Sequence, residues 1–170
     1  MKVELLISDI LEPTYPILNG RNGEIIKVNI KPIAEANSAR LYILQDEDWK
    51  DTFFGWRTFI NNGHHSTMNV VTPDDYAAFG IYKYIPCVDH LWIECMESIR
   101  RGDFNYIGLA IIADAILRSI SLGFNGRIKL KSMIQKDREN NPDEFYKSLG
   151  MEEEPHAISV LNNYNFDEIS

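Results

Sequence analysis

The chain is poor in cysteine, has more acidic than basic residues, and has no long apolar run. Two cysteines in 170 residues, Cys87 and Cys95, exclude a disulfide framework, and their spacing fits no CxxC metal or redox motif. We expect both thiols to be small buried side chains. No stretch approaches the roughly 18 consecutive apolar residues that mark a membrane span, and the first residues lack the pattern of a signal peptide. The sequence therefore predicts a cytoplasmic protein with no membrane partner.

The charge balance argues against a general nucleic-acid binder. Seventeen Lys and Arg residues stand against 25 Asp and Glu residues, which gives a formal net charge of −8. Binding to phosphates needs clustered basic residues, so we expect no nucleic-acid partner. Apolar residues make up 45% of the chain and charged residues 25%, as is typical of a globular protein. The length predicts one domain over residues 1–170, as a monomer or a homodimer.

The first third of the chain contains strand-like runs and then one helical pattern. Residues 3–10 are rich in apolar side chains, and residues 26–30 alternate between apolar and polar types. Residues 33–45 fit either a helix or a strand. A helix is predicted from Asp46, a plausible N-cap, to the stop signal at Gly63. Its apolar stripe consists of Trp49, Phe53, Trp56 and Ile60.

The middle of the chain predicts a mixed α/β fold. Strand-like segments cover 68–71, 76–85 and 88–99, and the strongest helical pattern covers 107–122, followed by a strand over 127–134. The turn signature between the first two strands predicts a hairpin. The last strand–helix–strand segment has the length of a crossover connection, so we expect strands 88–99 and 127–134 to be parallel.

The C-terminal part predicts one short helix and two more strands. Pro142 fits the first turn of a helix that Asn141 caps and Gly150 closes. Strand candidates follow over 156–161 and 164–169.

Few residues indicate a site by type and spacing alone. The adjacent His64 and His65 do not have the spacing of metal ligands, so we expect no metal site. A glycine-containing loop over 100–107 leads into the strongest helix, whose N-terminal N–H groups and dipole suit a phosphate. Arg100 and Arg101 flank this loop. Because every strand-to-helix loop ends at a helix N-terminus, a purely structural role stays open at this point.

Three segments resemble the GCN5-related N-acetyltransferase (GNAT) family. They read YIGLAII over 106–112, LGFNGRIKL over 122–130 and FYKSLGM over 145–151. In that family an acetyl-CoA phosphate loop and helix lead through a strand to a short helix with the pattern F-Y-x-x-L-G-[FM]. Gly80 stands where the family commonly has a glycine in its third strand. The resemblance covers roughly residues 40–170 and leaves the N-terminal strands, residues 1–35, unassigned.

The resemblance implies a GNAT-like acyl-CoA N-acyltransferase fold. Such a fold has a mixed, mostly antiparallel sheet with flanking helices, and its central parallel strand pair splays at a bulge in the fourth strand. Pantetheine enters that cleft. The implied reaction transfers an acetyl group from acetyl-CoA to a primary amine of a small-molecule or protein acceptor. The alternative is a non-catalytic GNAT-like domain that binds CoA or a protein partner.

The resemblance also implies site residues. Tyr146 matches the position that protonates the leaving thiolate, and Glu94 or Glu97 is the candidate base. A spacing of three residues on one strand predicts that these two carboxylates lie on opposite faces, so only one would face the cleft. The loop is atypical, because Asp103 and Tyr106 replace the usual Gln/Arg and the first glycine. The implied cofactor-binding residues are Cys95, Met96, Ser98, Arg100, Arg101, Gly102, Tyr106, Ile107, Gly108, Leu109, Asn141 and Phe145.

Overall fold

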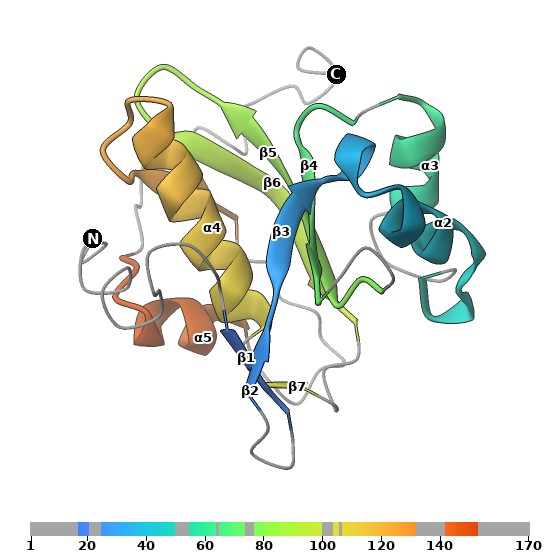
Figure 1. Ribbon diagram of the computed structural model, residues 1–170. Helices are drawn as coiled ribbons and strands as arrows, with labels where there is room; N and C mark the ends of the chain where they lie inside the picture. The colour runs from blue at the N-terminus through green and yellow to red at the C-terminus, as the bar shows by residue number, and fades with distance from the viewer. Residues whose placement is uncertain are drawn as a thin grey trace. The chain divides into compact units, whose positions relative to one another are not determined.

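The computed structural model divides the chain into two compact units, Val3–Leu130 and Lys131–Ser170 together with Met1–Lys2. The first unit holds both sheets and every described helix except α5 (Figure 1). The prediction of a single domain over 1–170 stays a prediction. The structure describes residues 17–20, 25–49, 55–63, 65–73, 77–99, 104–105, 107–131 and 142–152.

A five-stranded mixed sheet forms the centre of the first unit. Its strands, in spatial order, are β3 (Asn29–Pro32), β4 (Met68–Thr72), β5 (Gly80–Pro86), β6 (Leu91–Ser98) and β8 (Ile128–Leu130). Neighbouring strands are antiparallel except β6 and β8, which run parallel with Leu91 opposite Ile128 and Ile93 opposite Leu130. The predicted α/β class, the hairpin and the parallel pair are therefore confirmed. The expected continuation of β8 to residue 134 lies outside the described residues.

The turn between β5 and β6 is longer than the sequence pattern predicted. The Cys87 N–H donates to the His90 carbonyl oxygen at 2.9 Å, which closes a turn over the residues in between. Val88, predicted as the start of a strand, is 99% exposed in this turn. The β6 strand accordingly begins at Leu91, and β5 begins at Gly80 rather than at residue 76.

A smaller sheet in the same unit has the order β2-β1-β7. Its strands are β1 (Ile17–Gly20), β2 (Ile25–Lys27) and β7 (Phe104–Asn105). Only Val28 separates β2 from β3, so one extended segment takes part in both sheets. The strand-like pattern over 26–30 is thus confirmed, whereas the candidate strand over 3–10 lies outside the described residues.

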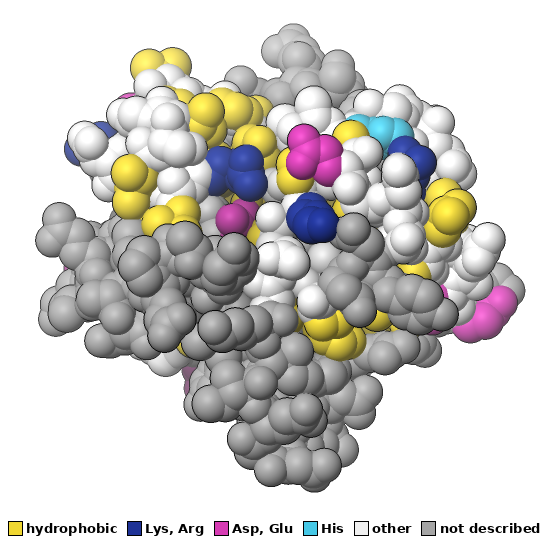
Figure 2. Space-filling model, viewed as in Figure 1, with side chains coloured by type: hydrophobic (Ala, Val, Ile, Leu, Met, Phe, Trp, Pro, Cys, Tyr) yellow, Lys and Arg dark blue, Asp and Glu magenta, His cyan; other side chains and the backbone are white. Residues whose placement is uncertain are grey.

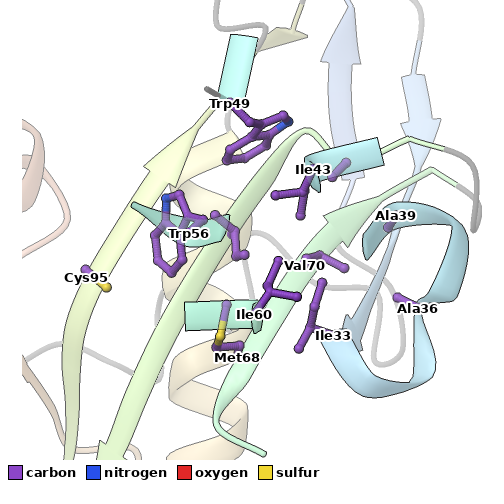
Figure 3. Packing of buried hydrophobic residues seen from close by; sticks show 12 residues of the cluster. Ile33, Ala36, Ala39, Ile43, Trp49, Trp56, Ile60, Met68, Val70 and Cys95 are labelled. Atoms are coloured by element: carbon purple, nitrogen blue, oxygen red, sulfur yellow. The ribbon is translucent and has the colours of Figure 1, made fainter. Parts of the chain in front are cut away.

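Four short helical segments pack on one face of the large sheet, named here the α2–α3 face. They are η1 (Ile33–Glu35), α2 (Asn37–Gln45), η2 (Glu47–Trp49) and α3 (Trp56–Asn61). The ambiguous residues 33–45 are therefore mainly helical. In Figure 3 the ring of Trp56 lies next to Cys95 of β6, and both belong to the core cluster of this face. That cluster consists of Ile33, Ala36, Ala39, Ile43, Trp49, Trp56, Ile60, Met68, Val70, Ala78, Ile81 and Cys95.

The prediction of one continuous helix from Asp46 to Gly63 is wrong. Gly55 adopts φ +61° and ψ 50°, a left-handed conformation that cannot continue a right-handed α-helix. The helix therefore begins anew at Trp56, after the separate segment η2. Trp49, Trp56 and Ile60 are buried, as the apolar stripe predicted, and Phe53 lies outside the described residues.

Helix α4 (Ile107–Ser121) covers the opposite face of the large sheet, named here the α4 face (Figure 1). Its buried side is largely aliphatic, which confirms the strongest helical pattern in the sequence. Helix α4 connects the two parallel strands β6 and β8, so the crossover predicted from chain length is present. The helix also approaches β5 closely at Gly80: a Cβ on that glycine would lie 2.8 Å from the Ile107 Cγ2 atom.

Candidate functional site

A β-bulge interrupts β6 close to the end of its pairing with β8. Lys83 of β5 lies opposite Cys95, but the next residue, Tyr84, lies opposite Ile93, so Glu94 is an extra residue in β6. Ile93 is also the last β6 residue with a described partner in β8. The described pairs between β6 and β8 are Leu91–Ile128, Trp92–Lys129 and Ile93–Leu130.

The bulge places Glu94 and Glu97 on the same face of the sheet. Glu97 lies opposite Ile81, and directly opposed residues of antiparallel strands share a face. The Glu94 carboxylate forms an ion pair with Lys83, which is two residues from Ile81 and shares its face. The expectation that only one of the two carboxylates could face the cleft is therefore wrong, because the extra residue shifts the alternation of β6 by one. Both carboxylates lie on the α2–α3 face.

The buried Lys83 and the exposed Glu94 form an ion pair on this face. Lys83 is 8% exposed, and the Glu94 side chain is 37% exposed. The Lys83 Nζ atom also lies 5.8 Å from the centroid of the Phe59 ring, a cation–π contact with α3. A buried ammonium needs such compensation, since an unpaired buried charge is costly. Through Lys83, the bulge in β6 therefore contacts both β5 and α3.

The Cys95 thiol at the bulge is buried. Burial is the main cause that raises the pKa of Cys95 well above its ordinary value, and the negative charge of Glu94 adds to it. The thiol therefore stays protonated, and Cys95 is a buried side chain as predicted. Cys87 is only half-buried, contrary to the prediction that both cysteines are buried, because it lies in the turn before β6.

The end of β6 and the start of α4 both lie next to Gly80 of β5. Gly80 lies opposite Ser98 in the sheet register, and a Cβ on it would lie 3.3 Å from the Glu97 carbonyl oxygen as well as near Ile107. Ile107 is buried, whereas Gly108 and Leu109 are half-buried. The first turn of α4, with its N–H groups, thus lies near the C-terminal end of β6 at Glu97 and Ser98. The expected binding residues Arg100, Arg101, Gly102, Tyr106 and Asn141 lie outside the described residues.

Phe145 and Tyr146 lie on α5 (Pro142–Ser148) in the second compact unit. Both side chains are half-buried, and their rings lie 5.4 Å apart between centroids. The helix closes at Gly150, which has φ +84°, as the sequence predicted. The position of the Tyr146 hydroxyl relative to β6 stays a prediction.

A polar cluster on the α4 face was not predicted from the sequence. The Tyr82 hydroxyl donates a hydrogen bond to Asp114. Arg118 donates to the Tyr82 hydroxyl at 3.3 Å and to the Asn69 side-chain oxygen at 3.4 Å, and lies 3.6 Å from Asp114. Burial raises the pKa of Asp114, although its two hydrogen-bonding neighbours oppose the rise. The one sequence signal for this cluster is the Asp114–Arg118 pair at i, i+4 on an otherwise apolar helix.

Metal-binding and membrane-spanning features were searched in the described part of the chain. It contains no group of three or more His, Cys, Asp or Glu side chains suited to a metal ion. The His65 side chain lies 2.7 Å from the Ile60 carbonyl oxygen, and His64 lies outside this part. None of the helices over these residues has the length and apolar character to span a membrane.

Sequence comparison gives no family for this chain: no protein-family model matches it, and no curated protein is significantly similar to it. Comparison of structures finds a transcriptional regulator from Bacillus halodurans at 18% identity and TM-score 0.48, with 74% of this chain and 93% of that chain covered. A GNAT-family acetyltransferase from Streptococcus pneumoniae has 13% identity and TM-score 0.44, covering 75% and 87%. An integron cassette protein from the mobile metagenome of V. cholerae has 15% identity and TM-score 0.44, covering 76% and 88%. Similarities at this level do not assign a function.

Proposed function

We propose that this chain is an acetyl-CoA-dependent N-acetyltransferase with a GNAT-like fold, and that it transfers an acetyl group to a primary amine. The observation that carries the proposal is the bulge at Glu94, directly after the last pair between β6 and β8. The family resemblance implied a bulge in the strand that splays from its parallel neighbour. The crossover of α4 between these strands supports the same assignment.

The edge of β6 and the start of α4 suit the two ends of acetyl-CoA. From the family resemblance, backbone groups of Cys95, Met96 and Ser98 would pair with pantetheine, directly after the last described pair between β6 and β8. The N–H groups of the first turn of α4 would hold phosphate oxygens. From the resemblance we add the remaining expected residues of the phosphate loop and the short helix. These are Arg100, Arg101, Gly102, Tyr106, Ile107, Gly108, Leu109, Asn141 and Phe145.

Proton transfer is assigned to three side chains. An amine with a pKa near ~10 must lose a proton before it attacks the thioester, and a carboxylate accepts that proton directly or through water. Glu97 and Glu94 are the candidate bases, and both lie on the same face of the sheet. Glu94 also forms the ion pair with Lys83. Tyr146 is the proposed acid that protonates the leaving thiolate. The acceptor amine would approach from the α2–α3 face, where the carboxylates lie.

The proposal includes a small-molecule or protein amine as the partner and neither nucleic acid nor membrane. On the face drawn in Figure 2, the described Lys and Arg side chains lie apart from one another, with acidic side chains near several of them. This distribution supports the argument from net charge, because a phosphate-binding surface needs grouped basic residues.

The test is a binding measurement followed by an activity measurement. Acetyl-CoA or CoA at about a hundred times its dissociation constant should stabilise the protein by ~2.7 kcal/mol, a rise in melting temperature of about 5–10 °C. Replacing Arg100 and Arg101 by Ala should weaken this shift, and the exposed Lys131→Ala serves as the control. Release of free CoA thiol is then followed with a panel of amines.

Two results would contradict the proposal in different ways. Absence of any melting shift at millimolar acetyl-CoA would remove the cofactor from the proposal. Binding without thiol release across the amine panel would favour the second candidate, a non-catalytic domain that binds CoA or a protein partner. That candidate has its own support in the atypical loop, where Asp103 would repel a phosphate and Tyr106 replaces a glycine.

A further inference from the structure

The polar cluster on the α4 face, formed by Asn69, Tyr82, Asp114 and Arg118, has hydrogen-bonding groups that the fold does not use. Asn69 of β4 lies directly opposite Tyr82 of β5 in the register, so both side chains are on one face of the sheet. Asp114 and Arg118 are the two charged residues of α4. The cluster therefore lies on the face opposite to the carboxylates assigned to proton transfer.

Arg118 is held in this cluster by long contacts. Its guanidinium group donates to the Tyr82 hydroxyl at 3.3 Å and to the Asn69 side-chain oxygen at 3.4 Å. It lies 3.6 Å from Asp114 and 5.4 Å from the centroid of the Tyr84 ring. Ordinary N–H···O bonds are about 2.7–3.2 Å long. Only 26% of the Arg118 side chain is exposed, so burial also removes much of its contact with water. Its donors therefore lack an acceptor at close range within the described part of the chain.

Asn69 has an unused donor next to Arg118. The residue is 1% exposed, and its Nδ2 atom has no hydrogen-bond partner among the described residues. The oxygen of the same amide accepts from Arg118, so the two groups with unused N–H donors are neighbours. Buried donors are nearly always paired in folded proteins. A carboxylate, with two acceptor oxygens, has the complementary chemistry.

Asp114 adds an acceptor to the same place. The Tyr82 hydroxyl and Arg118 both contact its Oδ2 atom, and no described residue pairs with its Oδ1 atom. The Asp114 side chain is 17% exposed. A ligand with a carboxylate alone would be repelled by the negative charge of Asp114. An ammonium group on the same ligand would instead pair with Oδ1.

We propose that the α4 face binds a small α-amino acid in this cluster. The ligand carboxylate accepts from the Arg118 guanidinium and from Asn69 Nδ2, and the ligand ammonium donates to Asp114 Oδ1. Arg118 moves from its long contacts toward the ligand, which uncovers the Asn69 amide. The zwitterion carries no net charge and matches the opposite charges of Asp114 and Arg118. This site goes beyond the proposed acetyltransferase function and does not depend on it.

The experiment is an NMR titration of the full-length ¹⁵N-labelled protein with three probes at constant ionic strength. Glycine carries both groups of the proposed ligand, whereas acetate carries only the carboxylate and methylammonium only the cation. We expect glycine to shift the side-chain N–H signals of Asn69 and Arg118, and to bind at least ~10-fold more tightly than either other probe. The side-chain signals of the exposed Asn62 and Arg127 are the internal controls and should not move.

Two variants separate the two ends of the ligand. Asp114→Asn removes the partner of the ammonium, so glycine should bind at least ~10-fold more weakly while acetate binding is not weakened. Arg118→Gln removes the main partner of the carboxylate and should weaken the binding of both glycine and acetate. Arg127→Gln, an exposed arginine replaced in the same way, should change neither.

The comparison of probes on the wild-type protein needs no variant, so it holds even if one variant fails to fold. If acetate binds as tightly as glycine, Asp114 takes no part and the assignment to an amino acid is wrong. If no probe moves the Asn69 and Arg118 signals, the cluster is not a binding site. Glycine binding that is unchanged in both Asp114→Asn and Arg118→Gln would place the ligand elsewhere and overturn the proposal.

Discussion

Gly80 of β5 and Ile107, the first residue of α4, lie in direct contact. A Cβ on Gly80 would be 2.8 Å from the Ile107 Cγ2 atom and 3.1 Å from the Ile111 Cδ1 atom. Real carbon atoms do not approach so closely, so only glycine lets the start of α4 lie this near the sheet. The glycine thus sets the distance between the candidate phosphate-binding helix and the end of β6.

Gly80→Ala should destabilise the protein by about 1–3 kcal/mol through overpacking, as measured by urea denaturation. Gly80→Ala combined with Ile107→Ala should cost less than the sum of the two single changes, because the second removes the nearest clashing atom. Strict additivity in this double-mutant cycle would contradict the contact.

Gly55 should also be sensitive to substitution, for a different reason. Its φ of +61° is left-handed, so Gly55→Ala should cost about 1–2 kcal/mol of unfolding free energy. Gly55→Asn is the matched control, because asparagine tolerates this conformation better than alanine does. Equal losses for the two variants would indicate a packing effect rather than a backbone effect.

Asp114 should give the protein a characteristic pH dependence. Burial raises its pKa in the folded state, so the folded state holds this proton more tightly than the unfolded state. The resulting stabilisation is present at low pH and is lost as pH rises through the raised pKa. As pH rises above the ordinary carboxyl pKa of about 4, wild type should therefore lose stability relative to Asp114→Asn.

Asp89 offers a control of opposite sign for that pH series. A hydrogen bond from His90 lowers the pKa of Asp89. The ionised Asp89 therefore stabilises the folded state above the ordinary carboxyl pKa, and this stabilisation is lost as pH falls. Wild type should lose stability relative to Asp89→Asn on acidification. If both variants shift in the same direction, the assignment for Asp114 is wrong.

The two thiols should react in a fixed order. Cys87 is half-buried and Cys95 is buried, and burial raises the pKa of both. With a chromogenic disulfide reagent at neutral pH, one slow phase from Cys87 should precede any reaction of Cys95, which should need unfolding. Cys87→Ser should abolish the first phase. A first phase that persists in this variant would place Cys95 within reach of solvent.

Tyr146→Phe tests the proposed acid. General acid catalysis contributes ~10²–10⁴-fold, so turnover should fall by that factor once an acceptor amine is known, with CoA affinity and melting temperature nearly unchanged. Phe145→Leu is the neighbouring control for packing of α5. Unchanged turnover in Tyr146→Phe would assign Tyr146 to packing alone.

The sequence predicted the parts of the fold that depend on local periodicity. Helix α4 has an aliphatic face repeated over four turns, and the chain length of its crossover restricts β6 and β8 to a parallel pair. The break at Gly55 was missed because the apolar stripe through Trp49 and Trp56 continues across it. An apolar stripe predicts which residues are buried, but it does not predict the backbone conformation of a single residue such as Gly55.

The geometry of the candidate site was less predictable. Alternation along β6 placed Glu94 and Glu97 on opposite faces, and the bulge reversed this. A bulge arises from the register between two strands, so the residues of β6 alone carry no signal for it. The contact of Tyr82 with Asp114 likewise joins residues 32 positions apart in the chain, beyond the range of any periodic pattern.

The N-terminal strands, which the family resemblance leaves unassigned, reach the candidate site through hydrogen bonds. Asn19 and Gly20 of β1 pair with Asn105 and Phe104 of β7, and β7 lies two residues before the first turn of α4. The N-terminal hairpin therefore holds residues 104–105, at the end of the proposed phosphate loop, by strand pairing. An expression fragment trimmed to the family-like region would leave that loop end without its partner strand.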